Sequence, residues 1–388
     1  MIGRVGLKIL YTIGFIIALS EAFPGYIRST FVEEFVDVQR VGLFFIGSAV
    51  LSLIVINFFP YFINKFTNYR LFLTVLVINI LSIILLITTD STVLAFIAFI
   101  IGGATMNLVW ISMDIFIEKC STNITTGRTR TIYLTLLSSG WLISPLIVGF
   151  LVGDNNYRLV YIFSIAFLLT VIGLVISKRK QLGERIHYKH HQTLKTLKNI
   201  WQNINLRGIF AISFLLEFFF AIIVVYTPIY LHEYIGLSWL TIGIVFTFML
   251  IPFILFEIPA GTFADKYHSE KKILMLGFMI LVSSVSLIFF IESTNPVVWA
   301  VILFLTRCGA ALIQAMRESY FFKIVDVKDL DYINFFRDIR PLAILIGMGL
   351  SIVVLKFYSL QYLFFFLAAV LFLGFYFTWR LKRVVPGE

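Results

Sequence analysis

Charged residues are scarce in this sequence. They make up 13% of the 388 residues, whereas hydrophobic residues make up 60%. About a quarter of the residues in an ordinary soluble domain are charged, so this composition excludes a water-soluble protein of this length. Cysteine is nearly absent too: Cys120 falls in a predicted loop and Cys308 in a predicted membrane span. Two cysteines placed in this way predict neither a disulfide nor a metal site.

Sequence motifs of several function classes are also missing. No Gly-rich phosphate loop ends in Gly-Lys-Ser or Gly-Lys-Thr, which argues against an ATP-driven motor. An enzyme would need His, Asp or Ser side chains clustered at one membrane face, but the carboxylates are scattered singly over different spans. We therefore expect no enzyme activity and no cofactor. His187, His190 and His191 have no carboxylate or thiolate nearby in sequence, so we expect no metal site.

Long apolar runs dominate what is present. A membrane-spanning helix needs about 20 mostly apolar residues, and twelve such windows can be drawn. The windows do not alternate between apolar and polar residues as the strands of an outer-membrane barrel do. The predicted fold class is therefore an all-α integral membrane protein. The predicted spans cover residues 5–26, 41–63, 71–89, 92–112, 131–152, 158–177, 208–231, 239–258, 272–291, 296–316, 341–356 and 360–379.

The formal net charge of +10 could suggest a nucleic-acid-binding protein, but the positions of the basic residues indicate a membrane topology instead. With the N-terminus inside, 26 of the 31 Lys and Arg residues fall in cytoplasmic segments. External loops contain Arg28, Arg40, Arg158 and Lys356, and Arg307 lies within a span. This asymmetry is the positive-inside rule. It predicts a multi-pass protein of the cytoplasmic membrane, with both termini cytoplasmic and no nucleic-acid partner.

Short repeated segments predict two related halves. Pro24-Gly-Tyr26 in the first span matches Pro228-Ile-Tyr230 in the seventh, and Phe62-Ile-Asn64-Lys65-Phe66 matches Phe263-Ala-Asp265-Lys266-Tyr267 at an offset of 201 residues. The first span therefore belongs to the repeat and is not a cleaved secretory signal. We predict a six-helix N-terminal half at 1–177 and a six-helix C-terminal half at 208–388.

Residues 178–207, between these halves, form a linker rich in Lys and Arg. Its apolar residues share one helical face, which predicts an amphipathic segment lying on the anionic inner leaflet of the membrane. The residues of this face are Leu194, Leu197, Ile200, Trp201 and Ile204.

The segment after the eighth predicted span carries a recognisable signature. Residues 261–272 read GTFADKYHSEKK, which resembles the cytoplasmic loop motif of the major facilitator superfamily, G-x-[L/F]-[A/S]-D-[R/K]-x-G-[R/K]-[R/K]. His268-Ser269 replace the usual glycine, and one residue is added before the basic pair. The resemblance extends over essentially the whole chain. It implies the fold of that superfamily, with two pseudo-symmetric six-helix halves and a substrate site between them near the membrane midplane.

A second motif lies in the fifth predicted span. Gly140, Pro145 and Gly149 resemble the pattern G-x-x-x-G-P-x-x-G-G of exporters in the superfamily, while Ser144 and Val148 depart from it. The resemblance favours an efflux-type transporter. Because small residues allow helices to approach closely and proline bends a helix, close packing without any export role is the alternative.

Polar residues within spans one, four, seven and ten predict a site for substrate and coupling ions, since such residues usually face a bundle interior or a wet cavity. Glu217 lies near the centre of the seventh span, where an isolated carboxylate favours its neutral form. That behaviour suits a proton carrier. Three roles are open for Arg307: a counter-charge to Glu217 or Glu257, a contact for an anionic substrate group, or a member of a permanent ion pair. The predicted substrate and ion-coupling residues are Glu21, Asn107, Trp110, Glu217, Tyr230, Arg307 and Gln314.

The superfamily resemblance also implies a cytoplasmic gate. Asp265 should lie against the fifth helix near Arg128, and Asn64 against the eleventh helix near Arg340. A salt-bridged surface loop without gating is the alternative. We expect Pro341 in the first turn of the eleventh helix. The predicted gating residues are Asn64, Lys65, Asp114, Arg128, Arg130, Glu257, Asp265, Lys266, Arg337 and Arg340.

These patterns predict a secondary active transporter that moves a small organic, amphipathic compound across the membrane by alternating access. Proton-coupled efflux is the leading hypothesis. One alternative is an importer of a metabolite whose anionic group meets Arg307, and another is a lipid-translocating or other membrane-embedded protein. The expected partners are a small-molecule substrate, a proton or other coupling ion, and the lipid bilayer. We expect the protein to be a monomer.

Overall fold

The computed structural model of the chain describes residues 4–120, 126–153, 156–179, 193–267, 270–325 and 330–382. Within these ranges, twelve helices are long and apolar enough to cross a membrane. The predicted fold class, an all-α membrane protein with twelve spans, is confirmed. The chain divides into two compact units, residues 1–190 and 191–388, and each contains six of the spans.

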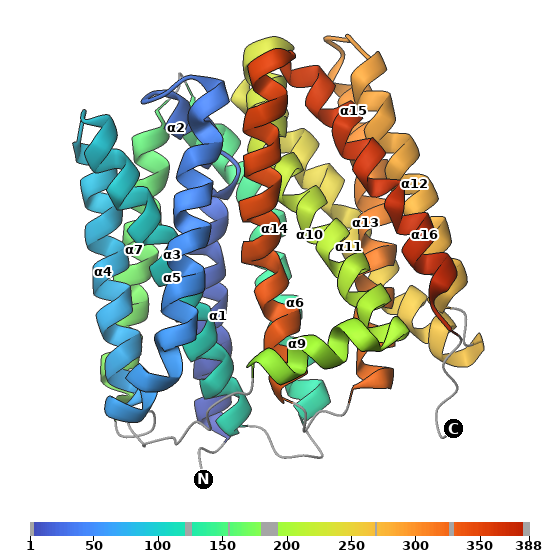
Figure 1. Cartoon of the computed structure of the whole chain (residues 1–388). Helices are drawn as coiled ribbons and strands as arrows, with labels where there is room; N and C mark the ends of the chain where they lie inside the picture. Colours follow the sequence, from blue (N-terminus) through green and yellow to red (C-terminus); the bar gives the residue numbers. More distant parts are fainter. Residues whose placement is uncertain are drawn as a thin grey trace. The chain divides into compact units, whose positions relative to one another are not determined.

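The described part of the first unit contains one short and six long helices (Figure 1). They are α1 (Arg4–Gly25), α2 (Arg28–Glu33), α3 (Val38–Lys65), α4 (Asn68–Thr88), α5 (Thr92–Cys120), α6 (Thr126–Val152) and α7 (Tyr157–Ser177). α1 packs against α6 and α7, while α5 packs against α3 and α4.

Small residues at the α1–α6 crossing let these two helices approach closely. A Cβ atom on Gly140 of α6 would lie only 3.4 Å from the Cβ of Ala18 on α1. The Ser144 hydroxyl donates to the Gly140 carbonyl of its own helix at 2.6 Å. On the other side of α1, the Ser164 hydroxyl of α7 donates to the Ser20 carbonyl at 2.6 Å. A small residue of the fifth span, Gly140, therefore lies at the contact between α6 and α1.

The second unit contains α9 (Thr193–Gln202), α10 (Ile204–Ile229), the π-helix η1 (Tyr230–Tyr234), α11 (Trp239–Tyr267), α12 (Glu270–Phe290), α13 (Pro296–Ile324), α14 (Leu330–Phe357), α15 (Leu360–Leu371) and α16 (Leu373–Arg380). α13 packs against both α11 and α12, α10 against α14, and α12 against α15. Together α15 and α16 form the last span.

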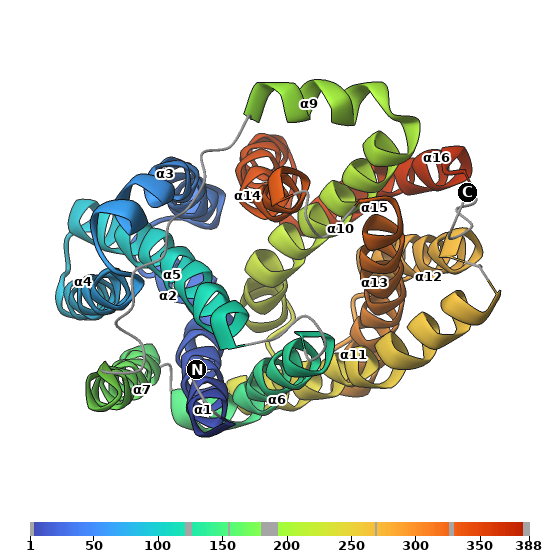
Figure 2. The same ribbon diagram turned by 90° about the horizontal axis from the view of Figure 1, so that it is seen from below.

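Helix α9 runs across the end of the second unit at which α10 begins, instead of along the unit's axis (Figures 1 and 2). It contacts α10 and α14. Ile200 is buried, whereas Trp201 is 71% exposed. The Asn203 side chain caps the start of α10 by accepting hydrogen bonds from the backbone N–H groups of Asn205 and Leu206.

Two expectations about helix ends are wrong. The signature segment was expected to be a loop, but α11 continues to Tyr267, and α12 begins at Glu270. Pro341 lies inside α14, which begins at Leu330, and not in its first turn. Hydropathy marks only the part of a helix that crosses the hydrocarbon. Polar residues outside the membrane prolong α14, because residues 330–340 contain no glycine or proline to end a helix.

Candidate functional site

Glu21 and Trp110, two predicted site residues, meet in the first unit. The indole Nε1 of Trp110 on α5 donates to Glu21 Oε2 on α1 at 2.6 Å. Both side chains are half-buried. A hydrogen bond to an ionised carboxylate is shorter and stronger than one between neutral groups, so this contact connects α1 to α5 through a titratable group.

A small cavity of about 50 Å³, lined mostly by apolar groups, lies beside Glu21 within the first unit. Asn79 and Tyr161 also line it. The Asn79 amide donates to the Gly102 carbonyl and to Thr105 Oγ1, at 2.7 and 2.9 Å. Neither Asn79 Oδ1 nor the Tyr161 hydroxyl has a hydrogen-bond partner among the described residues. Since a water molecule needs roughly 10–15 Å³ and two or more polar partners, the cavity suits a few water molecules or a small polar group.

Asn107, another predicted site residue, makes hydrogen bonds to a neighbouring helix and within its own. Its Nδ2 donates to Ser52 Oγ on α3 at 2.8 Å and to the Gly103 carbonyl at 3.2 Å. Ser52 in turn donates to the Ser48 carbonyl at 2.6 Å. These bonds fasten α5 to α3, so Asn107 contributes to helix packing. Asp114 lies two turns further along α5 and is half-buried.

Glu217 forms an ion pair in the second unit. Its Oε1 on α10 lies 2.8 Å from the Nη2 of Arg317 on α13, and the side-chain exposures are 13% for Glu217 and 10% for Arg317. The Arg317 guanidinium also lies 5.6 Å from the centre of the Phe336 ring. Arg307 was one expected counter-charge for Glu217, but the ion pair in the structure is with Arg317.

Arg317 was not predicted as a site residue, because the predicted tenth span ended at residue 316. Arg317 was therefore placed in a cytoplasmic segment exposed to water. In the structure α13 continues to Ile324 and keeps Arg317 buried. An ion pair of this kind is sensitive to charge, because removing one partner leaves the other buried and uncompensated, at a cost of about 3–5 kcal/mol.

Arg307 lies close to the middle of its span, Pro296–Phe321, and is only 2% exposed. Its guanidinium lies over the rings of Phe219 and Phe220, at 5.3 and 5.6 Å from their centres. Such contacts stabilise a cation by about 2 kcal/mol or more when it is desolvated. Gln314, further along the same helix, is half-buried.

Tyr230, a predicted substrate contact, is packed among aromatic rings. It is the first residue of η1, which directly follows α10, and Pro228 lies in the last turn of α10. The ring contacts Trp299 and Phe364 edge-on, with centroids 5.7 and 5.3 Å apart, and stacks on Tyr234 at 6.0 Å. The side chain is buried, so its observed contacts are those of a packing residue.

Few of the predicted gating side chains are described. Lys65 ends α3, with its Nζ 5.8 Å from the ring centres of both Tyr61 and Phe66, and Arg340 is exposed on α14. The remaining predictions concern side chains outside the part of the chain that the structure describes. These are the side chains of Asn64, Arg128, Arg130, Glu257, Asp265, Lys266 and Arg337.

A further polar cluster was not predicted. Buried Glu270, at the start of α12, pairs with Lys323 near the end of α13. Lys271, quoted above as part of the signature, donates to the carbonyls of Trp379 and Leu381 at 2.5 and 3.1 Å. It thus satisfies carbonyls left open at the end of α16. The cluster holds the end of the chain against α12 and α13.

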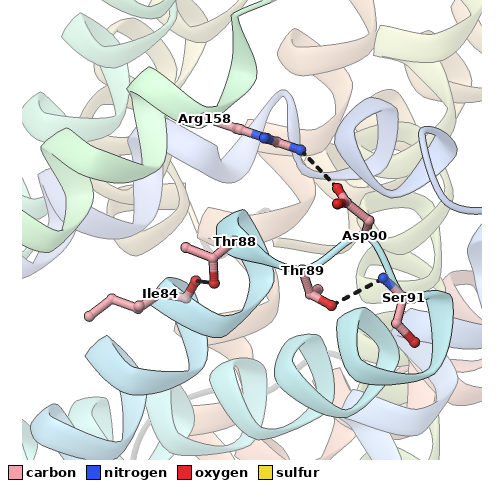
Figure 3. A network of polar contacts seen from close by, with 6 residues as sticks. All are labelled: Ile84, Thr88, Thr89, Asp90, Ser91 and Arg158. Atoms are coloured by element: carbon pink, nitrogen blue, oxygen red, sulfur yellow. Dashed lines mark hydrogen bonds and ion pairs between the residues drawn. The ribbon is translucent and has the colours of Figure 1, made fainter.

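The first unit also has a surface ion pair, which contrasts with the buried pair (Figure 3). Arg158 Nη2 at the start of α7 lies 3.6 Å from Asp90 Oδ1 in the α4–α5 connection, and the side chains are 54% and 95% exposed. The backbone N–H of Ser91 donates to Thr89 Oγ1 at 3.1 Å in the same connection. Exposed pairs contribute about 0–1 kcal/mol, so this pair is a suitable reference for charge removal.

A sequence profile of the family described as the Major Facilitator Superfamily matches residues 10–328. Among solved structures, the nucleoside transporter NupG gives a TM-score of 0.74 at 14% identity, covering 97% of this chain and 99% of that one. The peptide transporter POT, solved with sulfate, gives 0.74 at 12% identity, covering 98% of this chain and 96% of its own. No curated protein sequence matches the chain. At such low sequence identities, the solved structures show a common fold. The function has to be argued from the residues of the site.

Proposed function

We propose that this chain, which belongs to the major facilitator superfamily and is a secondary transporter, exports a small amphipathic organic compound in exchange for protons. The observation that carries the proposal is the buried ion pair of Glu217 and Arg317, 2.8 Å apart. Glu217 can gain a proton, whereas arginine keeps its charge. Protonation of Glu217 therefore acts directly on the contact between α10 and α13.

A proton on Glu217 removes the charge that compensates buried Arg317. Breaking such a pair costs about 3–5 kcal/mol, equivalent to a shift of about a hundredfold or more in a two-state equilibrium. A conformational change that gives Arg317 access to water or to another acceptor avoids this cost. In the proposal, proton binding thereby favours a different arrangement of α10 and α13, and this links protons to alternating access.

Glu21 supplies a second protonatable group, in the first unit. It accepts the hydrogen bond from Trp110 and lines the small cavity beside Asn79. A carboxylate at the edge of a cavity that suits water has a route for exchanging its proton. We assign Glu21 to proton exchange or to a polar part of the substrate.

Three further features support the choice of substrate, direction and membrane. Aromatic residues make up 17% of the chain, which favours a compound with apolar surface. The Gly140 segment resembles an exporter pattern. The distribution of Lys and Arg favours the cytoplasmic membrane with both termini inside. We further propose that the protein acts as a monomer.

Substrate-triggered proton movement in proteoliposomes tests the proposal. Purified protein is reconstituted with a pH-sensitive dye inside the vesicles, and amphipathic cations and small metabolites are added one at a time. We expect wild type to move protons in response to some compounds. Glu217→Gln should reduce that flux at least tenfold, because a glutamine amide does not take up and release a proton as a carboxylate does. Asp90→Asn removes one carboxylate from the exposed pair and should keep the wild-type flux.

Unchanged flux in Glu217→Gln would contradict the assignment of Glu217 to the proton path. The importer hypothesis has one specific observation in its favour, the buried Arg307 in the middle of α13. Uptake of an anionic compound that is lost in Arg307→Gln and retained in Glu217→Gln would favour that alternative.

A further inference from the structure

The second unit has a cavity at the end where α10 begins and α16 ends. It measures about 270 Å³ and is lined by Trp201 of α9, by Arg207 and Gly208 of α10, and by Tyr376, Phe377 and Arg380 of α16. It lies apart from the Glu217 and Arg317 pair and has no part in the proposed transport mechanism. Among the described residues that line it there is no carboxylate, so its two arginines make it strongly positive.

Aromatic rings position both arginines. The Arg207 guanidinium lies 5.8 Å from the centre of the Trp201 ring, and that of Arg380 lies 5.1 Å from the centre of the Tyr376 ring. Cation–π contacts of this kind stabilise a charged side chain without neutralising it. The guanidinium N–H groups therefore stay available to a phosphate, which arginine binds through two parallel hydrogen bonds.

The backbone around the cavity is also held in place. The Lys382 N–H donates to Asn205 Oδ1 at 3.1 Å, and the Tyr320 hydroxyl donates to the Lys382 carbonyl at 2.7 Å. Gly208 lets the chain end approach α10, since a Cβ there would lie 2.7 Å from Leu381 Cδ2. These contacts fix the end of α16, which carries Arg380, to α10, which carries Arg207. The two arginines are therefore held in position before any ligand binds.

An apolar stripe on the last span runs away from the cavity. Its members are Phe372, between α15 and α16, and Tyr376 and Trp379 of α16, with exposures of 63%, 49% and 68%. On a membrane span, a stripe of this kind faces lipid, and aromatic residues there lie at the level of the headgroups. A ligand that matches both features carries a phosphate for the arginines and an acyl chain for the stripe.

We propose that this cavity binds the headgroup of an anionic phospholipid, with the phosphate at Arg207 and Arg380 and an acyl chain along α16. Basic pockets between membrane helices on the cytoplasmic side are suited to such headgroups. The bound lipid connects α9 and α10 to the last span. The inference depends on the membrane spans and not on proton coupling. A failure of the proposed function would therefore leave it intact, and its own failure would leave the proposed function intact.

Titration of the purified full-length protein in detergent micelles tests this inference. Thermal stability is followed against dioctanoyl phosphatidylglycerol, dioctanoyl phosphatidylcholine and inorganic phosphate. We expect phosphatidylglycerol to stabilise wild type and the other two to have little effect. Each basic side chain near an anionic lipid strengthens binding about fivefold, so Arg207→Gln with Arg380→Gln should weaken the apparent affinity about 30-fold. The single variants should each weaken it about fivefold, and Arg207→Lys should keep most of it.

The matched control removes two exposed arginines elsewhere, Arg70→Gln with Arg179→Gln, and should keep the wild-type affinity. The single variants keep the inference testable if the double variant does not fold. Equal affinity of wild type and the Arg207 and Arg380 variants would overturn the site. Equal stabilisation by inorganic phosphate would overturn the lipid assignment in favour of a free anion. Equal stabilisation by phosphatidylcholine would overturn the role of the arginines.

Discussion

Charged side chains inside the helix bundles have several kinds of partner. Glu217 forms an ion pair with Arg317, half-buried Glu21 accepts a hydrogen bond from Trp110, and Arg307 lies over two phenylalanine rings. Both groups of the Glu217–Arg317 pair are charged, so one added proton weakens this contact more than it weakens the hydrogen bond from Trp110 to Glu21. The bond from Trp110 becomes weaker but still forms when Glu21 is neutral, because the carboxyl keeps an acceptor oxygen.

Replacing Trp110 by Phe removes the donor to Glu21 while keeping an aromatic ring. We expect Trp110→Phe to lower the free energy of unfolding by about 1.5–3 kcal/mol, since a hydrogen bond to a charged group contributes about that much. Trp141→Phe is the matched control, because Trp141 packs edge-on against Tyr26 at 5.8 Å between ring centroids. Denaturant unfolding in detergent micelles measures both variants. Equal losses would mean that the bond to Glu21 adds nothing to packing.

Helix packing depends on small residues at a few crossings. In lipid, burial of apolar side chains gives little driving force between helices, so association depends on close contact. Gly309 allows α13 to approach α12. A Cβ on Gly309 would lie 2.7 Å from the Gly277 carbonyl oxygen and 2.7 Å from the Leu281 backbone nitrogen. Both neighbours are backbone atoms, so a side chain at this position forces the helices apart.

Gly309→Ala is expected to destabilise the second unit by about 1–3 kcal/mol, the usual cost of overpacking a core. Gly349→Ala on α14 is the control, because nothing lies within 4 Å of the added Cβ. It should be neutral or stabilising by up to about 1 kcal/mol, since alanine favours helix over glycine. Thermal unfolding in detergent distinguishes the two. A melting temperature for Gly309→Ala at or above that of wild type would contradict the close packing of α12 and α13.

At the scale of the whole molecule, the positions of basic residues determine the predicted orientation. The connection that contains Asp90 is expected outside, and the start of α4, with exposed Arg70, is expected in the cytoplasm. The side chain of Asp90 is 95% exposed, so a cysteine at this position is accessible to a reagent.

Cysteine labelling of whole cells tests this orientation. In a background with Cys120→Ala and Cys308→Ala, we expect a membrane-impermeant maleimide to label Asp90→Cys in intact cells. Arg70→Cys should react only after the cells are permeabilised. The opposite pattern would reverse the orientation, and equal labelling of the two sites in intact cells would contradict a single topology.

Some residues that make polar contacts between helices were predictable from the sequence, because a polar residue in an apolar span is unusual by itself. Glu21, Trp110 and Glu217 were singled out in this way, and each makes a polar contact between two helices. Arg317 was not recognised, because it lies beyond the apolar window although the helix continues. The contact of Asn107 with Ser52 was not predictable either, since it depends on how α5 is rotated against α3.

The sequence by itself determined the membrane environment and the twelve spans, because the requirement for an apolar helix in lipid applies to each short stretch of the chain separately. Each span is recognised from about 20 consecutive residues whose backbone must form a helix in hydrocarbon. Only the tertiary structure decided which partner each buried polar group meets. Glu217 meets Arg317, Asn107 meets Ser52, and Tyr230 meets Trp299, because partners depend on the rotation, tilt and depth of two helices distant in sequence. Those quantities follow from the packing of many side chains at once, and no local pattern encodes them.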